Sequence, residues 1–345
     1  MDKLVLFDNS IINNLLNTRL GETKFGEHIN TLTYVSNIYD SLKNLDVKYV
    51  IFGLPEAVGV FANHGKSGTS TAWEATIKVL LNIQSNTFTQ AKNVLVLGHL
   101  DFTEEQKQLS KLNQDDPKHI AKSRKLVAQM DTHVVDLVSN IVKAGKIPIA
   151  IGGGHNNAYG MIKGTSLALK QPINSINFDA HTDFRALEGR HSGNGFSYAF
   201  EEGFIKKYFI FGLHESYTSK GILQNLKELE KQIQYISYDD IAVKNKISYK
   251  AAIDKANQFI SQDYYGVEID LDAIQNIESS AMTPSGFSVQ QARQFIYAIG
   301  QNKKSSYLHI CEGFSANEVK QKANQTGKLI AYFITDFIKS KSEKN

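Results

Sequence analysis

The residues best suited to chemistry in this sequence are acidic side chains and histidines that alternate within short segments. Asp179, His181 and Asp183 occupy every second position of one segment, and Asp270 and Asp272 do so in a later one. Residues i, i+2 and i+4 of an extended chain point to the same side. Each segment therefore directs its ionisable groups into one shared space.

A further histidine, His155, follows glycines 152–154, which allow a tight turn into the next helix. If these segments lie together, at least four carboxylates and two imidazoles meet, and so many like charges cannot share a partly buried site without cations. An oxygen-rich set without thiolate suits manganese better than structural zinc, and six ligands exceed what one catalytic ion usually takes from protein. We therefore predict two manganese ions per subunit, held by His155, Asp179, His181, Asp183, Asp270 and Asp272.

Each of these motifs, taken alone, also has an ordinary structural explanation. A glycine-rich segment before a histidine is often only a strand-to-helix turn, and alternating aspartates are often helix caps or solvated loops. What favours function is that all of them follow predicted strands. The carboxyl ends of parallel strands meet at one edge of a sheet, where α/β proteins bind their ligands.

The elements that must position these residues can be read from the hydrophobic pattern. Short apolar, β-branched or aromatic runs alternate with amphipathic stretches, which is the pattern of parallel strands joined by crossover helices. Eight candidate strands begin at Val47, Asn93, Ile147, Asn174, Lys207, Ile233, Tyr264 and Ser306, and the amphipathic segments include 118–144, 249–261, 289–298 and 316–339. We predict one α/β domain over 46–340, an N-terminal extension at 1–45 packed on it, and a frayed tail at 341–345.

Composition argues against several classes of function. The 345 residues are 42% hydrophobic and 21% charged, as in an ordinary globular protein. A net charge of +3 with scattered lysines gives no reason to expect nucleic-acid binding. The one cysteine, Cys311, cannot form an internal disulfide, and no apolar run reaches the length of a signal-peptide core or a membrane span. We expect a cytoplasmic protein that binds no membrane.

In order and spacing, the motifs resemble those of the arginase, agmatinase and formimidoylglutamase (ureohydrolase) family. The matching segments are GGGH at 152–155, FDAHTDFR at 178–185, IDLDAI at 269–274 and the late Glu312, and the likeness extends from about Phe52 to the last helix. The resemblance implies a three-layer α/β sandwich with an eight-stranded parallel sheet, a manganese pair and a homo-oligomer. It also implies that His155, Asp179, Asp183 and Asp270 hold one side of the pair and that His181 and Asp272 complete it.

Within that family, the sequence is most similar to the formimidoylglutamase branch. Arg185 stands where arginases have a neutral amide, and a guanidinium there suggests a substrate carboxylate that it grips bidentately. The segment from His191 resembles the substrate loop, which places Ser192 and Asn194 at the polar end of the substrate. Phe196 replaces a histidine of arginases, which argues against arginine as substrate. The sequence departs from the family at Gln275-Asn276, where most members have Asp-Pro, and at Asn156, where several have a glutamate, but neither departure removes a metal ligand.

The resemblance implies a binuclear hydrolase that cleaves a C–N bond of a linear amidine, here N-formimidoyl-L-glutamate to L-glutamate and formamide, in histidine degradation. The metal pair would lower the pKa of water and supply a nucleophile at neutral pH. Glu312 would orient the cationic amidinium group of the substrate. Asp183 would carry the proton to the departing amine.

Two alternatives stay open at this point. The chain could act as an arginase, an agmatinase or a guanidino-acid hydrolase that releases urea, although Arg185 would repel the cationic tail of agmatine. It could also be a catalytically inactive, metal-binding regulatory subunit, although the ligand set and Glu312 are intact. Deacetylases that share the sheet architecture need fewer acidic ligands. The ordinary explanation for Arg185 is an ion pair with Glu188 or Glu201, and His191 and His214 receive no role.

Overall fold

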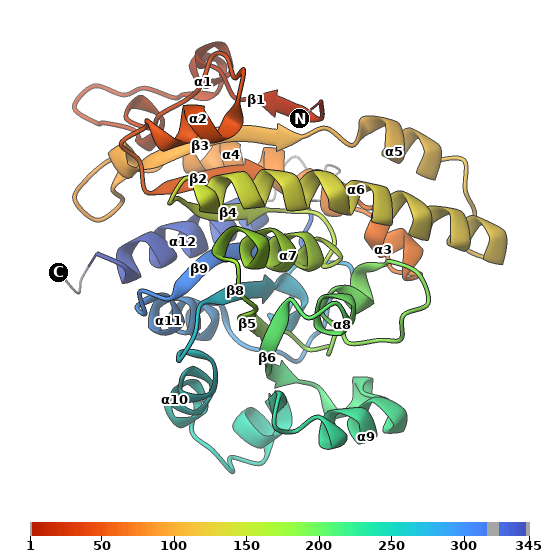
Figure 1. Cartoon of the computed structure of the whole chain (residues 1–345). Helices are drawn as coiled ribbons and strands as arrows, with labels where there is room; N and C mark the ends of the chain where they lie inside the picture. The colour runs from red at the N-terminus through yellow and green to blue at the C-terminus, as the bar shows by residue number, and fades with distance from the viewer. Residues whose placement is uncertain (1, 316–323, 343–345) are drawn as a thin grey trace.

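One mixed sheet forms the centre of the protein, which we describe from a computed structural model that covers residues 2–315 and 324–342. The described residues contain nine strands in the order β1-β3-β2-β4-β9-β8-β5-β6-β7 (Figure 1). Their bounds are β1 Leu4–Leu6, β2 Tyr49–Gly53, β3 Val94–Leu100, β4 Ile147–Ile151, β5 Ile173–Phe178, β6 Ile205–Leu213, β7 Ile233–Ser237, β8 Tyr265–Asp270 and β9 Ser305–Cys311.

All eight predicted strands are present, and every pairing among them is parallel. The central strands β2, β5 and β8 are buried at every position because helices cover both faces of the sheet. The prediction of eight strands was one short, because β1 adds an edge strand antiparallel to β3, with Leu4 opposite Leu100. The three residues of β1, of which Val5 is exposed, give too short a pattern to distinguish a strand from a loop.

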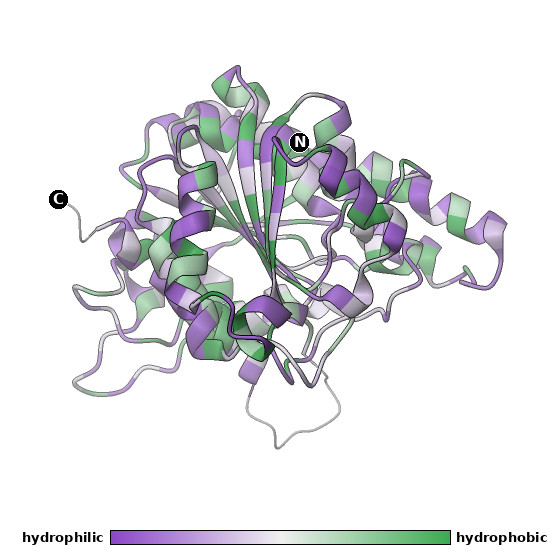
Figure 2. Cartoon of the chain, turned by 90° about the horizontal axis from the view of Figure 1, so that it is seen from below, coloured by the Kyte–Doolittle hydropathy of each residue, from purple (hydrophilic) through white to green (hydrophobic). Residues whose placement is uncertain are grey.

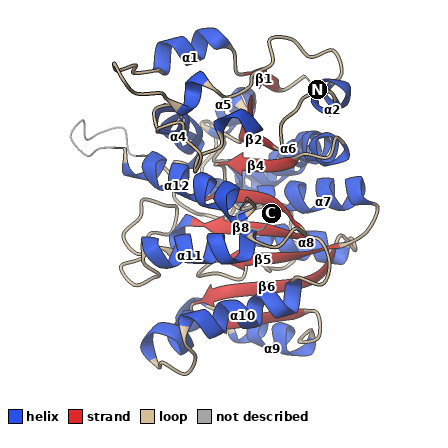
Figure 3. Cartoon of the chain, turned by 90° about the vertical axis from the view of Figure 1, so that its left-hand side faces the viewer, coloured by secondary structure: helices blue, strands red, loops and turns tan. Residues whose placement is uncertain are grey.

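Helices form a layer on each side of this sheet. In Figure 3 the strands, from β1 at the top to β6 near the bottom, lie between these two layers. Their bounds are α1 Asn9–Leu15, α2 Ile38–Lys43, α3 Val58–Ala62, α4 Ala72–Leu80, α5 Thr103–Leu109, α6 Pro117–Lys143, α7 Asn157–Leu169, α8 Gly195–Glu201, α9 Lys220–Glu228, α10 Tyr249–Ile260, α11 Val289–Gly300 and α12 Gln325–Ser340. One hydrophobic core joins the sheet to α4, α10, α11 and α12, and a second joins it to α6, α7 and α8. The chain is therefore a single α/β domain in three layers.

The helices alternate hydrophilic and hydrophobic residues, as surface helices with one face on a sheet must (Figure 2). The long helix α6 begins at Pro117, with the side chain of Asp116 accepting a hydrogen bond from the backbone of Lys118. Helix α7 packs closely against α6, because a Cβ on Gly160 would lie 2.5 Å from the side chain of Val134. This contact fixes the helix whose first turn follows His155.

The structure describes only the second part of the predicted C-terminal helical segment. Helix α12 covers 325–340, and the first part of the predicted 316–339 segment lies outside the described residues. Most of the predicted tail at 341–345 lies outside them too, but Lys341 donates hydrogen bonds to the carbonyls of Asn302 and Ser305. Among the helices described, none is both long and apolar enough to cross a membrane.

Candidate metal centre and substrate pocket

The predicted ligands meet at the carboxyl ends of four adjacent strands. Strand β4 leads into His155, β5 into Asp179, β8 ends at Asp270, and β9 leads into Glu312. These strands are neighbours in the order β4-β9-β8-β5, although the chain reaches them far apart in sequence. The parallel sheet thus brings the motifs that contain His155, Asp179 and Asp270 to one rim, as predicted, with Glu312 beside them.

Four of the ligands form what we call the inner group: His155, Asp179, Asp183 and Asp270. The Nδ1 atom of His155 lies 2.8 Å from a carboxylate oxygen of Asp183, 3.2 Å from Asp270 and 3.3 Å from Asp179. The side chain of His155 is fully buried. Three carboxylates therefore converge on one side of a single imidazole.

The outer group consists of Asp179, His181 and Asp272, and so shares Asp179 with the inner group. The Nδ1 atom of His181 lies 3.3 Å from Asp272 and 3.4 Å from Asp179. The side chain of His181 is 31% exposed. Two donor groups joined by one carboxylate can hold two cations with a bridging ligand.

The chemistry of this donor set fits divalent cations. Burial and the charge of Asp179 raise the pKa of Asp183 to about 6, and burial together with Asp272 raises the pKa of Asp270. Both ring nitrogens of His155 lack a hydrogen-bond partner among the described residues, despite the carboxylates around Nδ1. A buried cluster of this kind is stabilised when cations take the place of the missing partners. Oxygen and imidazole donors suit manganese.

The thiol of Cys311 also lies near this cluster, in a group with His155 and His309. Burial raises the pKa of Cys311 well above its usual value, so the thiol stays protonated at neutral pH. Its Sγ atom donates a hydrogen bond to the backbone carbonyl of Ile269 at 3.6 Å. The donor set therefore remains one of carboxylates and imidazoles, and Cys311 is a buried structural residue.

Sequence reasoning missed Glu56, which holds the glycine loop before His155. One of its carboxylate oxygens accepts from the backbone of Gly154 at 2.8 Å and from the side chain of Asn157 at 2.7 Å, and the other accepts from the backbone of Val58 and Gly59. A Cβ on Gly153, where φ is +71°, would lie 2.9 Å from the carbonyl of Leu54. The signal in the sequence was that Glu56 is an acidic residue three positions after the end of strand β2.

A second buried carboxylate, that of Glu268, lies behind His155. Glu268 is fully buried, and its oxygens lie 2.6 Å from Nδ1 of His309 and from the hydroxyl of Tyr307. Burial alone would raise the pKa of Glu268, but the charges and hydrogen bonds of His309 and His155 together outweigh burial and lower the pKa to about 2. Nε2 of His155 faces this carboxylate at 3.6 Å. Glu268 thus lies behind the imidazole on the side away from the inner group.

Two of the predicted reactive carboxylates sit on unusual backbone. Asp183 has φ +42° and Glu312 has φ +63°, in the left-handed region that non-glycine residues rarely adopt. Such conformations persist where surrounding contacts hold them, and they cluster at functional sites. Here the contacts include Oε1 of Glu312 accepting from the backbone of His155 at 2.6 Å, and its Oε2 accepting from the hydroxyl of Ser280.

A cavity of about 310 Å³ opens above the two donor groups. Its lining includes Asp183, Asp270, Asp272 and Glu312, together with Arg185 and Ser192. Burial, partly offset by the hydroxyl of Ser280, raises the pKa of Glu312 to about 8. The structure thus brings Glu312, Arg185, Ser192 and four of the six predicted ligands to one cavity, and His155 and Asp179 are buried next to those four.

Asn194 is the predicted substrate residue that the structure does not bring to this cavity. Its side-chain oxygen accepts from Arg190 and from the backbone of His191, and its nitrogen donates to the carbonyls of Ala186 and Gly189. Its amide is therefore used to hold the loop together. The next helix places Phe196 beneath the site, with its ring stacked on Tyr208 and edge-on to His155.

The guanidinium of Arg185 already has partners in the structure. It donates to the amide oxygen of Asn63 at 2.7 Å and to Glu188 at 3.1 Å. The ion pair with Glu188 was the ordinary explanation weighed from the sequence, and it is present. With 47% of its side chain exposed and a position on the cavity wall, Arg185 still faces the space above the donor groups.

An aromatic stack borders the outer group. The ring of Tyr217 lies 5.7 Å from that of His181 and 5.4 Å from that of His214, and both pairs are nearly parallel. Tyr217 also lines the cavity. Residue His214, to which the sequence gave no role, therefore supports the aromatic wall beside His181.

Curated proteins with similar sequences are named formimidoylglutamases. Among curated relatives, a formimidoylglutamase of Macrococcus caseolyticus is 28% identical over 223 residues, which is 63% of this chain and 68% of the relative. A formimidoylglutamase of Streptococcus gordonii is 27% identical over 276 residues, 76% of this chain and 75% of the relative.

Solved structures agree on the fold. Formimidoylglutamase from Bacillus subtilis superposes with a TM-score of 0.71 at 18% identity over 94% of both chains. Formiminoglutamase from Trypanosoma cruzi, solved with manganese, superposes with a TM-score of 0.69 at 17% identity over 92% of this chain and 98% of its own.

The family itself follows from the sequence match over most of the domain. Residues 47–338 match the Arginase family, and that range contains every residue of the inner and outer groups together with Glu56, Arg185 and Glu312. The chain therefore belongs to the arginase family.

Proposed function

We propose that this protein is a formimidoylglutamase, a hydrolase that cleaves a C–N bond of N-formimidoyl-L-glutamate and releases L-glutamate and formamide. Family membership and the names of the curated relatives support this proposal. The observation that carries it is Arg185, a guanidinium on the wall of the cavity above the donor groups. A guanidinium at that position complements a substrate carboxylate and opposes a cationic substrate tail.

The proposed metal content is two manganese ions per subunit. His155, Asp179, Asp183 and Asp270 would hold one, and Asp179, His181 and Asp272 would hold the other, as the inner and outer groups suggest. When bound, such a pair lowers the pKa of water and supplies a nucleophile at neutral pH. The chain's own contribution is to keep six ionisable side chains buried or half-buried around one cavity floor.

Two carboxylates are proposed to act on the substrate directly. Glu312 lies at the side of the cavity with its oxygens fixed by the backbone of His155 and the hydroxyl of Ser280. A cationic amidinium group is the natural partner of a buried carboxylate held in this way, and it would keep Glu312 ionised. Asp183 faces the cavity with a raised pKa, which suits a group that takes up a proton and passes it to the leaving amine.

The remaining residues are proposed to bind the glutamate part. Arg185 would grip a carboxylate, and the hydroxyl of Ser192, which accepts from Asn63 at 3.2 Å, would contact its polar end. Asn194 would act by shaping this loop. We also propose a cytoplasmic homo-oligomer with its activity in residues 46–340, packed against the N-terminal extension.

Turnover on four compounds tests the proposal. The manganese-loaded protein is given N-formimidoyl-L-glutamate, arginine, agmatine and guanidinobutyrate in parallel, and formamide and urea are measured. Formamide from the first compound is expected, with at least a tenfold rise in KM for Arg185→Ala because a charged hydrogen bond contributes about 1.5–3 kcal/mol. Urea from the other compounds would contradict the substrate assignment, and silence on all four with metal bound would favour an inactive subunit.

A further inference from the structure

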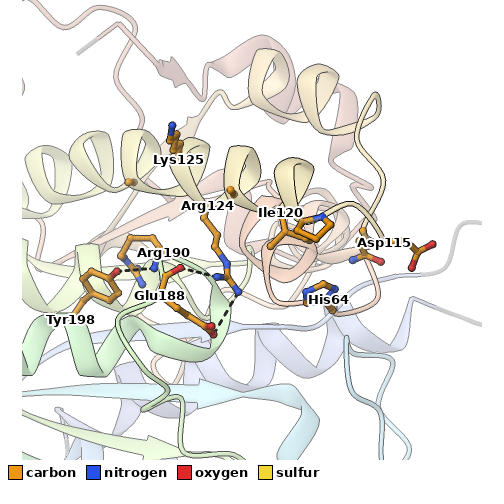
Figure 4. A pocket seen from close by; sticks show the side chains of 13 residues that line it. His64, Asp115, Ile120, Arg124, Lys125, Glu188, Arg190 and Tyr198 are labelled. Atoms are coloured by element: carbon orange, nitrogen blue, oxygen red, sulfur yellow. Dashed lines mark hydrogen bonds and ion pairs between the residues drawn. The ribbon is translucent and has the colours of Figure 1, made fainter.

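The carboxylate of Glu188 contacts two guanidinium groups. Its Oε1 atom lies 3.1 Å from Arg185, which lines the cavity above the donor groups, and 3.5 Å from Arg124 of helix α6. Glu188 and Arg124 themselves line a second cavity, of about 760 Å³ (Figure 4). The carboxylate is therefore shared between an arginine proposed to bind substrate and one that does not line the substrate cavity.

A third contact on the same oxygen comes from a neutral histidine. Nδ1 of His191 accepts from the backbone of Gly193 at 3.1 Å, so the ring proton must sit on Nε2, which lies 3.1 Å from Oε1 of Glu188. Burial, together with Arg185 and Arg124, lowers the pKa of His191 to about 4. His191 thus donates a hydrogen bond to Glu188 without adding charge at neutral pH.

The formal charges of this cluster do not cancel. Arg124 and Arg185 carry two positive charges, and Glu188 carries one negative charge, because burial is outweighed by both arginines and its pKa is lowered. Arg124 is also anchored independently, with one nitrogen donating to the carbonyl of Glu188 at 2.7 Å. Arg124 therefore stays beside Glu188, and its ion pair with that carboxylate weakens the attraction between Glu188 and Arg185.

We propose that Glu188 and Arg124 are positioning residues that set how strongly Arg185 attracts a substrate carboxylate. This inference rests on the proposed function of Arg185. Glu188 competes with the substrate carboxylate for the guanidinium, and Arg124 weakens that competition by sharing Glu188. Arg185 is thereby held in place by Glu188 and Asn63 yet keeps an attraction for one more anion.

The proposal predicts a direction that a structural role would not give. Glu188→Gln keeps the size and one acceptor but removes the competing charge, so KM for N-formimidoyl-L-glutamate should fall about threefold while kcat stays unchanged. In Arg124→Met, Glu188 loses its second ion-pair partner and interacts more strongly with Arg185, so KM for N-formimidoyl-L-glutamate should rise about threefold. Because these charges are partly exposed, both effects should shrink at high salt.

The double variant separates the mechanism from a sum of local effects. In Glu188→Gln with Arg124→Met, the effect of removing Arg124 should disappear, since no carboxylate is left for it to share. Lys125→Met is the matched control, because Lys125 lines the same cavity but points away from Glu188 (Figure 4). It should leave KM unchanged. A higher KM in Glu188→Gln, or additive effects in the double variant, would overturn the proposal.

A binding measurement keeps this inference separate from the substrate assignment. The dissociation constant of L-glutamate, measured by calorimetry on each variant with manganese bound, should follow the same pattern as KM. If formamide is not produced but glutamate binding strengthens in Glu188→Gln and weakens in Arg124→Met, the proposed function fails and the inference stands. If formamide is produced and glutamate binding ignores both substitutions, the inference alone fails.

Discussion

The two donor groups at the rim of the sheet share Asp179 but differ in their surroundings. In the inner group the imidazole of His155 is fully buried, with three carboxylates on one side and Glu268 behind it. In the outer group the imidazole of His181 is 31% exposed, faces the carboxylates of Asp179 and Asp272, and stacks on the ring of Tyr217. Burial makes the inner group dependent on its own partners, whereas water can substitute in the outer one. The two proposed metal positions should therefore respond differently to the same kind of change.

The largest effect should come from removing the buried imidazole. His155→Asn takes away the group that faces three buried carboxylates, and breaking a buried charged contact costs about 3–5 kcal/mol, or roughly 10² to 10⁴ in affinity. Manganese content measured after dialysis should fall from two per subunit to one or fewer, and activity should be lost. His181→Asn should cost only about tenfold in affinity. Equal losses in the two variants would break the comparison.

Metal removal should produce the next largest effect and should depend on pH. The folded pKa of Asp183, about 6, lies above its ordinary value of 3.8, so the folded metal-free protein binds more protons than the unfolded chain between these values. The contribution of Asp183 to stability should therefore be fully present near pH 4 and be lost as pH rises through 6, by on the order of 3 kcal/mol. Glu312 should extend the loss toward pH 8. Urea unfolding from pH 4 to 8, with and without manganese, measures this.

Manganese should reverse that trend, because cations stabilise the ionised carboxylates and binding to the folded state adds stability. At pH 8 the loaded protein should be more stable than the metal-free protein, and the difference should shrink at pH 5. A metal-free stability that rises between pH 4 and 8 would contradict the charge balance described for the inner group.

Substitution of Glu268 should have a smaller effect on manganese affinity, and only at the inner group. Glu268→Gln keeps the volume but removes the charge behind His155, and such supporting carboxylates typically contribute about 10- to 100-fold in metal affinity. Calorimetric titration should show one weakened manganese site and one unchanged site. Tyr307→Phe, which removes only one of the hydrogen bonds to Glu268, should weaken the same site less. Weakening of both sites together would mean that Glu268 acts on the whole rim.

The smallest effect should come from the aromatic wall of the outer group. Tyr217→Leu removes a ring stacked on His181, an interaction of about 0.5–1.5 kcal/mol, and should weaken only the outer site by roughly tenfold or less. Phenylalanine at this position should restore the wild-type value, since the stack uses the ring and not the hydroxyl. A loss in the phenylalanine variant would show that the hydroxyl, and not stacking, is what matters.

Local patterns in the sequence were enough to predict the sheet and to group the proposed metal ligands. The alternation in DAHTD and DLD picked out side chains that do lie together, but the shared face of an extended chain was the wrong reason for it. Strand β5 ends at Phe178, Asp183 has φ +42°, and Asp272 lies in a short 3-10 helix, so loops at the rim of the sheet bring these side chains together. The partners of these residues could not be predicted in the same way. Glu56 contacts Gly154 across 98 positions and Ser280 contacts Glu312 across 32, and such pairings depend on how loops fold over the rim. The antiparallel strand β1 was missed because three residues carry too little pattern.

The left-handed backbone at Asp183 and Glu312 also bears on how this protein can be altered. Asparagine and glycine adopt such angles at low cost, whereas valine, isoleucine and threonine do not. In a library that varies either position, amide and glycine replacements should still give folded protein, and β-branched ones should be lost before their chemistry can be assayed. Evolution of new activity from this scaffold is therefore more accessible through the side chains of the cavity wall than through these two carboxylates.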